Sequence, residues 1–160
     1  MDQTKTKTTA PDFFLYLGVI IGLYASVISL IALLFELINK WLPDVTTYYD
    51  LSGSGMRFPI AVLIIFFPVF MYLSRMSTKA IVLAPEKKEM WIRRWFSFLT
   101  LFVAGLTIAI DLAVLIYNFI GGEDLTLRFV LKVVVVLVVA AVIFRYYLYE
   151  LRRDPTVPAP

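Results

Sequence analysis

Four long apolar runs, separated by short charged segments, constrain what this chain can fold into more than any other feature. They cover residues 13–38, about 58–73, about 91–120 and 127 to about 149. An α-helix rises about 1.5 Å per residue, so about 20 apolar residues cross the roughly 30 Å hydrocarbon core of a bilayer. In the whole chain 61% of the residues are hydrophobic and 17% are charged. Soluble domains are about half apolar and about a quarter charged, so this excess must face something other than water.

The sequence therefore predicts an all-α integral membrane bundle of four transmembrane helices, in a single domain over residues 13–153. Residues 1–12 and 154–160 are polar or rich in proline and are predicted to be flexible cytoplasmic tails. The first run is too long for the apolar part of a signal peptide and is not followed by a cleavage site of small residues, so we expect it to be retained. Pro68 lies inside the second run and predicts a kink, because proline removes a backbone hydrogen bond.

The positive charges predict an orientation in the membrane. Eleven of the 15 Lys and Arg residues lie in the N-terminal tail, between the second and third runs, or at the C-terminal end. Lys and Arg are in excess in cytoplasmic segments, so both termini are predicted to be cytoplasmic. The segment from Ala84 to Arg94 is predicted to be a cytoplasmic helical extension of the third span. Its basic residues either only follow this topology rule or also contact anionic lipid head groups, at about 1 kcal/mol each: Lys87, Lys88, Arg93 and Arg94.

Polar residues in the third run recur on one side of the predicted helix. Asp111 shares a stripe with Thr100, Thr107 and Asn118, at successive spacings of 7, 4 and 7 residues. An ionisable group at membrane depth costs a few kcal/mol or more, so the stripe is predicted to face the inside of the bundle. If the third and fourth helices form a tight hairpin, Lys132 lies within about 3 Å of the level of Asp111 along the axis. We therefore predict an ion pair between these two side chains.

Glu36 and Arg57 form a second possible pair, at the ends of the first two spans. Together with Asp111 and Lys132 they would make a charged cluster in one half of the bundle. Two interpretations of this cluster stay open. In the first, the Asp111–Lys132 pair is structural and fixes the register of two helices, since either charge alone is costly in lipid. In the second, Asp111 titrates as part of an ion or proton pathway.

Small residues line one side of the first run. Gly18, Gly22, Ser26 and Ser29 follow one another at spacings of four, four and three residues. Small residues at this spacing let two helix backbones approach closely in a membrane. Such a stripe is common in polytopic bundles, so we expect it to pack within the monomer rather than to form a dedicated dimer contact.

The absence of cysteine and histidine excludes several kinds of chemistry. Without thiolate or imidazole there is no cysteine nucleophile, no usual general base and no conventional zinc or haem site. Metal binding by carboxylates alone needs a cluster at one depth, which the sequence does not offer. The basic residues lie close to the membrane, so nucleic-acid binding has little support. We expect no cofactor, no metal and no enzymatic activity.

Several segments resemble a bacterial membrane family that is catalogued as domain-of-unknown-function family 5671. These segments are Phe13-Phe14-Leu15-Tyr16, residues 29–39, Pro43-Asp44, Arg57-Phe58 and Phe67-Pro68-Val69-Phe70. The resemblance covers about residues 13–153. It implies a small four-helix protein of a bacterial membrane, which we place in the inner membrane, and it supplies no activity and no site residues.

Two hypotheses about function follow from these patterns. The first is an oligomeric ion or proton channel, or a transporter-like protein, that uses the charged cluster. The alternative is a non-catalytic accessory or scaffold protein that binds another membrane protein through helix packing. Its partners would then be the lipid bilayer and either a second copy of the chain or another membrane protein.

Overall fold

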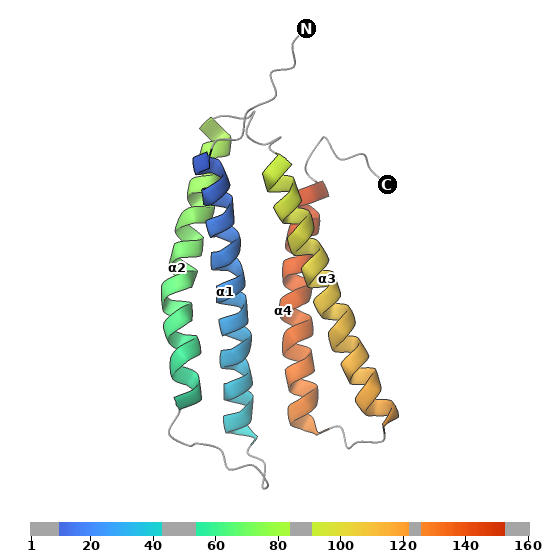
Figure 1. Cartoon of the computed structure of the whole chain (residues 1–160). Helices are drawn as coiled ribbons and strands as arrows, with labels where there is room; N and C mark the ends of the chain where they lie inside the picture. The colour runs from blue at the N-terminus through green and yellow to red at the C-terminus, as the bar shows by residue number, and fades with distance from the viewer. Residues whose placement is uncertain (1–9, 43–53, 84–90, 122–125, 153–160) are drawn as a thin grey trace.

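Four long helices make up the described part of the computed structural model, which covers residues 10–42, 54–83, 91–121 and 126–152. They are α1 (Ala10–Trp41), α2 (Ser54–Leu83), α3 (Trp91–Ile120) and α4 (Leu127–Arg152) (Figure 1). Each is long and apolar enough to cross a membrane. Even α4, with 26 residues, is about 39 Å long at 1.5 Å per residue, which exceeds the hydrocarbon core. The predicted all-α, four-helix membrane architecture is confirmed.

The main difference from the sequence prediction concerns the second helix. The apolar run ends near Leu73, but α2 continues to Leu83. A helix need not stop where hydrocarbon stops, because the serine, threonine and basic residues that follow the run can remain helical in the interfacial region. Thr78 Oγ1 donates a hydrogen bond of 3.0 Å to the carbonyl oxygen of Ser74, one turn earlier. The helix also continues through Pro68 without interruption. Because proline has no backbone N–H, the carbonyl oxygen of Ile64 lacks its usual helical donor there.

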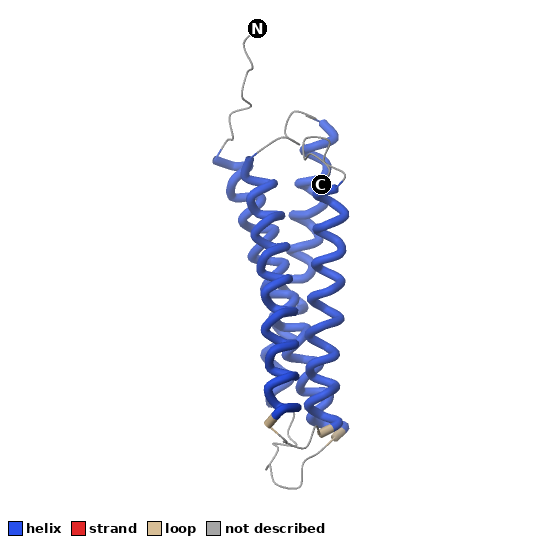
Figure 2. The backbone as a smooth tube through the Cα atoms, turned by 90° about the vertical axis from the view of Figure 1, so that its right-hand side faces the viewer, coloured by secondary structure: helices blue, strands red, loops and turns tan. Residues whose placement is uncertain are grey.

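The helices pair as two antiparallel hairpins. α1 packs along α2, and α3 packs along α4. The two hairpins contact each other through α1, which packs against α4 and, to a smaller extent, against α3. Among the helices of the described ranges, α2 contacts α1 alone. The result is an open arrangement rather than a closed four-helix bundle, because α2 lies beside α1 and away from α3 and α4 (Figure 1). In the view of Figure 2, all the described helices run along the long axis of the molecule. We call the contact of α1 with α3 and α4 the seam.

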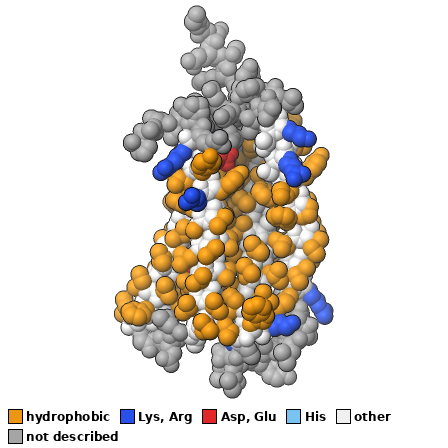
Figure 3. All heavy atoms as spheres, turned by 180° about the vertical axis from the view of Figure 1, so that it is seen from behind, with side chains coloured by type: hydrophobic (Ala, Val, Ile, Leu, Met, Phe, Trp, Pro, Cys, Tyr) orange, Lys and Arg blue, Asp and Glu red, His pale blue; other side chains and the backbone are white. Residues whose placement is uncertain are grey.

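Two ends of the molecule can be distinguished. α1 begins and α4 ends at one end, which we call the terminal end, whereas the opposite hairpin end carries the α1–α2 and α3–α4 connections (Figure 1). On the face shown in Figure 3, apolar side chains cover the middle of the molecule and basic side chains lie towards both ends. Many large apolar side chains are exposed along all four helices, Phe58 and Ile120 to more than three quarters. A lipid environment accounts for this surface, because contiguous apolar area of this extent is rare on soluble monomers.

The α1–α2 contact depends on glycine. A Cβ atom added at Gly22 would lie 3.1 Å from Phe70 Cβ and 3.2 Å from Phe70 Cα. A Cβ atom added at Gly18 would lie 2.9 Å from Leu73 Cδ1. Ser26 and Ser29 continue this side of α1 and are both buried. The structure thus places the small-residue stripe against α2 of the same chain, where it allows the two backbones to approach closely.

Candidate functional site

A polar cleft opens in the seam near the terminal end. It has a volume of about 100 Å³ and residues of all four helices line it. Its hydroxyl groups come mainly from a serine- and threonine-rich part of α2 and from α3, and the aromatic residues come from every helix. The lining residues are Tyr16, Val19, Ile20, Phe70, Ser74, Ser77, Thr78, Phe96, Ser97, Tyr146, Tyr147 and Glu150.

Helix periodicity brings these residues together. Ser74 and Thr78 are one turn apart on α2, and Ser77 lies between them on the side that is buried. On α4, Tyr146, Tyr147 and Glu150 fall within five consecutive residues, so they line the cleft over little more than one helical turn. The cleft thus joins the polar continuation of α2, beyond its apolar run, to the tyrosine-rich end of α4.

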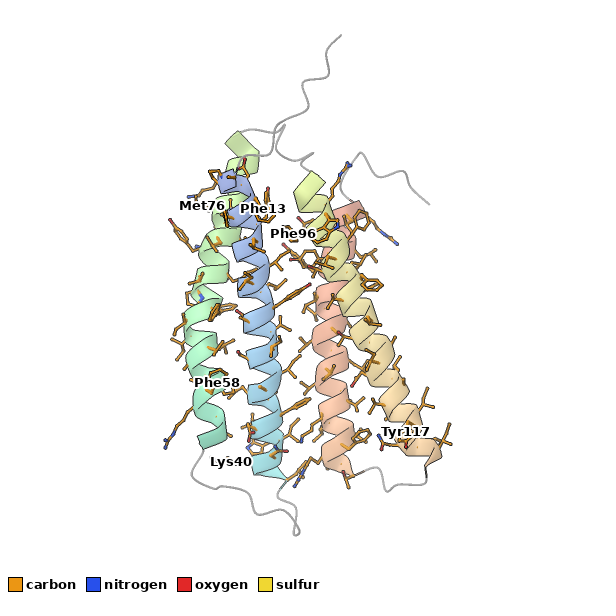
Figure 4. All side chains as sticks on the ribbon, in the orientation of Figure 1. Phe13, Lys40, Phe58, Met76, Phe96 and Tyr117 are labelled. Atoms are coloured by element: carbon orange, nitrogen blue, oxygen red, sulfur yellow. The ribbon has the colours of Figure 1, made fainter. Side chains whose placement is uncertain are left out.

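Aromatic rings support the wall of the cleft on the α1 and α3 side. Phe96 packs with Tyr16 and Ile20 in the small buried core of the molecule. Its ring centroid lies 5.2 Å from that of Trp95 and 6.4 Å from that of Phe13. Figure 4 shows Phe96 and Phe13 near the terminal end, between α1 and α3. Aromatic pairs at such distances add to the stability of a packed contact, so this wall is built from bulky, well-supported side chains.

A second cavity follows the cleft along the seam towards the hairpin end. Its volume is about 290 Å³ and its walls are almost entirely apolar. We call it the crevice. Thr100 and Tyr24 lie where it begins, and Tyr24 donates a hydrogen bond of 3.4 Å from its hydroxyl to Thr100 Oγ1. Thr100 is only 1% exposed. The lining residues are Tyr24, Val27, Ile28, Ile31, Thr100, Val103, Ala104, Thr107, Val139, Ala140 and Ile143.

The polar stripe predicted on the third helix faces this seam over much of its length. Thr100 and Thr107 line the crevice, and Asp111 lies one turn beyond Thr107 on the same side of α3. Thr107 and Asn118 donate to backbone carbonyl oxygens one turn earlier, at 2.8 Å each, so neither side chain needs a partner from another helix. Asp111 Oδ2 is different: it is a buried oxygen without a hydrogen-bond partner.

The predicted ion pairs are not formed in the structure. Lys132 Nζ lies 5.5 Å from the centroid of the Phe35 ring, so this ammonium group faces α1 and makes a cation–π contact there instead of reaching Asp111. Residue spacing in a tight α3–α4 hairpin predicts the depth of Lys132 along the helix axis, but it does not predict the side of α4 from which the side chain projects. Asp111 and Lys132 therefore form no ion pair in this structure.

The second predicted ion pair, between Glu36 of α1 and Arg57 of α2, is not formed either. The Glu36 carboxyl group lies against Gly55, where an added Cβ would meet its oxygens at 3.0 and 3.2 Å. Arg57 is exposed and makes no ion pair with Glu36. At this end another basic residue, Arg128, donates from its guanidinium group to the carbonyl oxygen of Leu42 and so connects α4 to the end of α1. No ion pair joins any two of these four charged residues in the structure.

Most of the proposed head-group contacts cannot be placed. Lys87 and Lys88 lie outside the described residues, as does most of the predicted helical extension, and the side chain of Arg93 is not described either. Arg94 is half-buried at the start of α3 and interacts with other residues there. Within the described ranges, no group of three or more acidic residues could hold a metal ion.

Sequence reasoning missed the polar cleft. The predicted second span ends near Leu73 and so leaves out Ser74, Ser77 and Thr78, and the sequence prediction gives no role to Tyr147 or Glu150. One signal was available: Ser74, Ser77 and Thr78 have helical i, i+3 and i+4 spacing, which a loop does not require. The meeting of these residues with α4 depends on tertiary packing between the hairpins, which no local pattern reports.

The comparisons with known proteins establish a family. A profile for a domain of unknown function, DUF5671, matches residues 12–147. The chain belongs to the DUF5671 family. No curated protein and no solved structure matches it. The DUF5671 match includes α2 and α3 and most of α1 and α4, and with them the residues that line both cavities except Glu150, which lies just beyond it.

Proposed function

We propose that this DUF5671 protein is a small membrane transport protein in which the substrate moves along the seam between its two hairpins. One observation carries the proposal. The polar stripe of α3 follows the seam from the cleft at the terminal end, through Thr100 and Thr107 in the crevice, towards Asp111. Polar groups at membrane depth are costly and commonly mark substrate or ion pathways. The open packing of the hairpins also supports movement, because few buried contacts hold the seam closed.

Asp111 is the proposed carrier of a proton in this pathway. Its buried Oδ2 lacks a hydrogen-bond partner, and Lys132 faces Phe35 instead of neutralising it. A charged carboxylate with one oxygen buried and without a partner is unfavourable at membrane depth, whereas protonation removes the charge and gives the group a donor. The finer hypothesis of proton-coupled or ion transport thus rests on Asp111 alone and no longer needs the four-residue cluster.

The first test is a flux assay. Purified protein is reconstituted into liposomes that contain a pH-sensitive dye, and proton flux is driven by a potassium diffusion potential. We expect flux above that of empty liposomes, loss of most of it in Asp111→Asn and retention in Asp111→Glu, which keeps a titratable group. Equal flux from the wild type and from Asp111→Asn, with both proteins folded by circular dichroism, would remove Asp111 from the mechanism.

A second test asks whether the seam has to open. The chain has no cysteine, so a pair of introduced cysteines is unique. Ile20→Cys with Phe96→Cys joins the hairpins across the seam, where these residues share the buried core. Gly18→Cys with Leu73→Cys is the control within one hairpin. A short bifunctional thiol reagent should stop flux in the first pair and leave it unchanged in the second. Unchanged flux in both cross-linked proteins would contradict movement along the seam.

One observation favours the alternative of an accessory or scaffold protein. α2 contacts only α1 among the described helices and presents exposed apolar residues along its length, such as Ile64, Phe67 and Tyr72. Either lipid or a membrane-protein partner would cover such a face. If reconstituted protein carries no flux under any gradient, and a photo-crosslinker placed at Ile64 recovers a specific second chain, the scaffold function replaces transport.

A further inference from the structure

The crevice is an elongated slot at the middle of the membrane. It extends along α1 from Tyr24 to Ile31 and along α3 from Thr100 to Thr107, which is about 10 Å on each helix. Both helices begin at the terminal end and run in the same direction (Figure 1), and the Tyr24–Thr100 hydrogen bond joins the two walls at one end of the slot. These residues lie near the middle of both helices. The crevice is therefore at the depth where the acyl chains of the two leaflets end.

The crevice opens sideways, between α1 and α3. Ile28 of α1 and Val103 of α3 line it and are 67% and 38% exposed. Ala104 and Ala140 also line it but are 6% and 5% exposed, so they form its inner wall. α1 contacts α3 less than it contacts α4, which accounts for an opening on the α3 side. In a bilayer this opening faces hydrocarbon.

The lining does not favour water. Thr100 Oγ1 donates to the carbonyl oxygen of Phe96 at 2.9 Å, and Thr107 Oγ1 donates to that of Val103 at 2.8 Å. The hydroxyl of Tyr24 donates to Thr100, so all three hydroxyl protons of the described lining are used within the protein. A buried water needs two to four polar partners, and apolar cavities remain dry. An empty space would leave the walls without dispersion contacts, so hydrocarbon is the occupant that this lining accepts.

The size and shape of the crevice agree with part of an acyl chain. Its volume of about 290 Å³ is about twice that of a cavity of about 150 Å³ that binds benzene, which has six carbon atoms. By the same proportion it takes roughly ten chain carbons. Its long direction follows the helices, as acyl chains do in a bilayer. A lipid head group at the interface is about 15 Å from the middle of the hydrocarbon core, so the end of its chain reaches the crevice.

We propose that the crevice binds the terminal part of an acyl chain of a bilayer lipid, which enters sideways between α1 and α3. The head group stays at the membrane surface, so the site recognises the chain and not the head group. This inference goes beyond the proposed transport function and does not depend on it. A bound chain lies between the cleft and Asp111, and movement of a substrate along the seam would require the chain to withdraw.

The test locates chain ends on the protein. The full chain is reconstituted into phosphatidylcholine vesicles that contain a tracer of phosphatidylcholine with a diazirine at the end of one acyl chain. After irradiation, tandem mass spectrometry measures the adducts on each residue. We expect adducts on Val139 and Ala104, which line the crevice, and on Val138, which faces outwards. Adducts on Val138 without adducts on the crevice residues would overturn the proposal. A phosphatidylglycerol tracer should give the same pattern, and a pattern that changed with the head group would contradict recognition by the chain alone.

Variants that fill the crevice give the matched comparison. Ala140 is buried in the crevice wall, whereas its neighbour Ala141 is exposed at nearly the same depth. Ala140→Leu places about three more carbon atoms where the chain would lie, so adducts on Val139 should fall at least about tenfold while those on Val138 stay unchanged. Ala141→Leu should leave the adducts on Val139 unchanged. Ala104→Leu fills the crevice from the opposite wall and should act like Ala140→Leu. Undiminished adducts on Val139 in either filled variant, folded by circular dichroism, would overturn the proposal.

A second measurement tests for water in the crevice. The chain has no cysteine, so Val139→Cys introduces a single thiol there. A water-soluble thiol reagent should modify it at least about a hundredfold more slowly than Lys40→Cys, which is exposed at the hairpin end. Equally fast modification of both would show a water-filled crevice and overturn the proposal. A dry crevice without lipid adducts would hold another occupant and would also overturn it. Neither measurement involves flux, so loss of this inference leaves the transport function standing, and absence of flux leaves this inference standing.

Discussion

Replacement of Gly22 by alanine should destabilise the protein through the contact between α1 and α2. The added Cβ would lie 3.1 Å from Phe70 Cβ and 3.2 Å from Phe70 Cα, closer than ordinary van der Waals contact. These atoms belong to the backbone or are fixed to it, so relief requires the two helices to move apart. Overpacking of this kind costs about 1–3 kcal/mol. We expect a loss of that size in the free energy of unfolding, measured by SDS titration in mixed micelles and followed by circular dichroism.

Two further glycines supply matched controls. At Gly18 the added Cβ meets only Leu73 Cδ1, the end of a side chain, at 2.9 Å, so Gly18→Ala should be rescued by Leu73→Ala. At Gly105 the nearest atom is Phe144 Cε2 at 3.5 Å, which is ordinary contact. Gly105→Ala should therefore be neutral or stabilise the helix by up to about 1 kcal/mol.

A second substitution at Phe70 tests whether the stability lost in Gly22→Ala can be restored. Phe70→Ala keeps both the Cα and the Cβ atoms that the new methyl group meets, so it should not restore stability to Gly22→Ala. If Gly22→Ala were as stable as the wild type, or if Phe70→Ala rescued it, the close approach of the two backbones would be wrong. An equal loss in Gly105→Ala would show that any glycine replacement is harmful and would remove the geometric argument.

Three more outcomes follow from the seam and can be measured by the same unfolding titration. A double-mutant cycle of Lys132→Met with Asp111→Asn should be additive within about 0.5 kcal/mol, because the two groups do not interact, whereas a coupling of several kcal/mol would restore the ion pair. Lys132→Met with Phe35→Leu should instead couple by about 0.5–2 kcal/mol through the lost cation–π contact, and strict additivity would contradict that contact. Tyr24→Phe should cost about 0.5–1.5 kcal/mol, since it removes the hydrogen bond to Thr100, and a neutral result would mean that this 3.4 Å bond contributes nothing to stability.

The architecture followed from the sequence because it depends on a local quantity. The length and polarity of an apolar run decide whether a helix can cross a bilayer, and α3 indeed begins and ends close to the predicted positions, at Trp91 and Ile120. The α2 boundary was wrong for a reason of the same kind. Hydropathy reports where hydrocarbon ends, whereas helix formation continues into the interface, so the helix outlasts the apolar run by ten residues.

The candidate site followed from the sequence only in part. The stripe with Thr100, Thr107 and Asp111 was visible because its members lie on one helix and share its period. The partner of Lys132 was not, since cross-helix contacts depend on the rotation of each helix about its own axis. A rotation of α4 by a fraction of a turn about its axis is enough to turn Lys132 from Asp111 towards Phe35 without changing its depth in the membrane. The spacing of Ser74, Ser77 and Thr78 indicated one wall of the cleft, but their meeting with Tyr147 and Glu150 depends on how the two hairpins pack, which no spacing along one helix reports.

The contact of α2 with α1 alone has a consequence for how the protein is assembled. Each hairpin is held together mainly by its own pair of helices, and the two halves adhere through a single intervening strip of side chains. The two hairpins are therefore related to each other much as two subunits of a dimer are, although one chain contains both. A chain divided between Leu83 and Trp91 would thus yield two fragments, each able to insert into a bilayer by itself and to find the other by lateral diffusion.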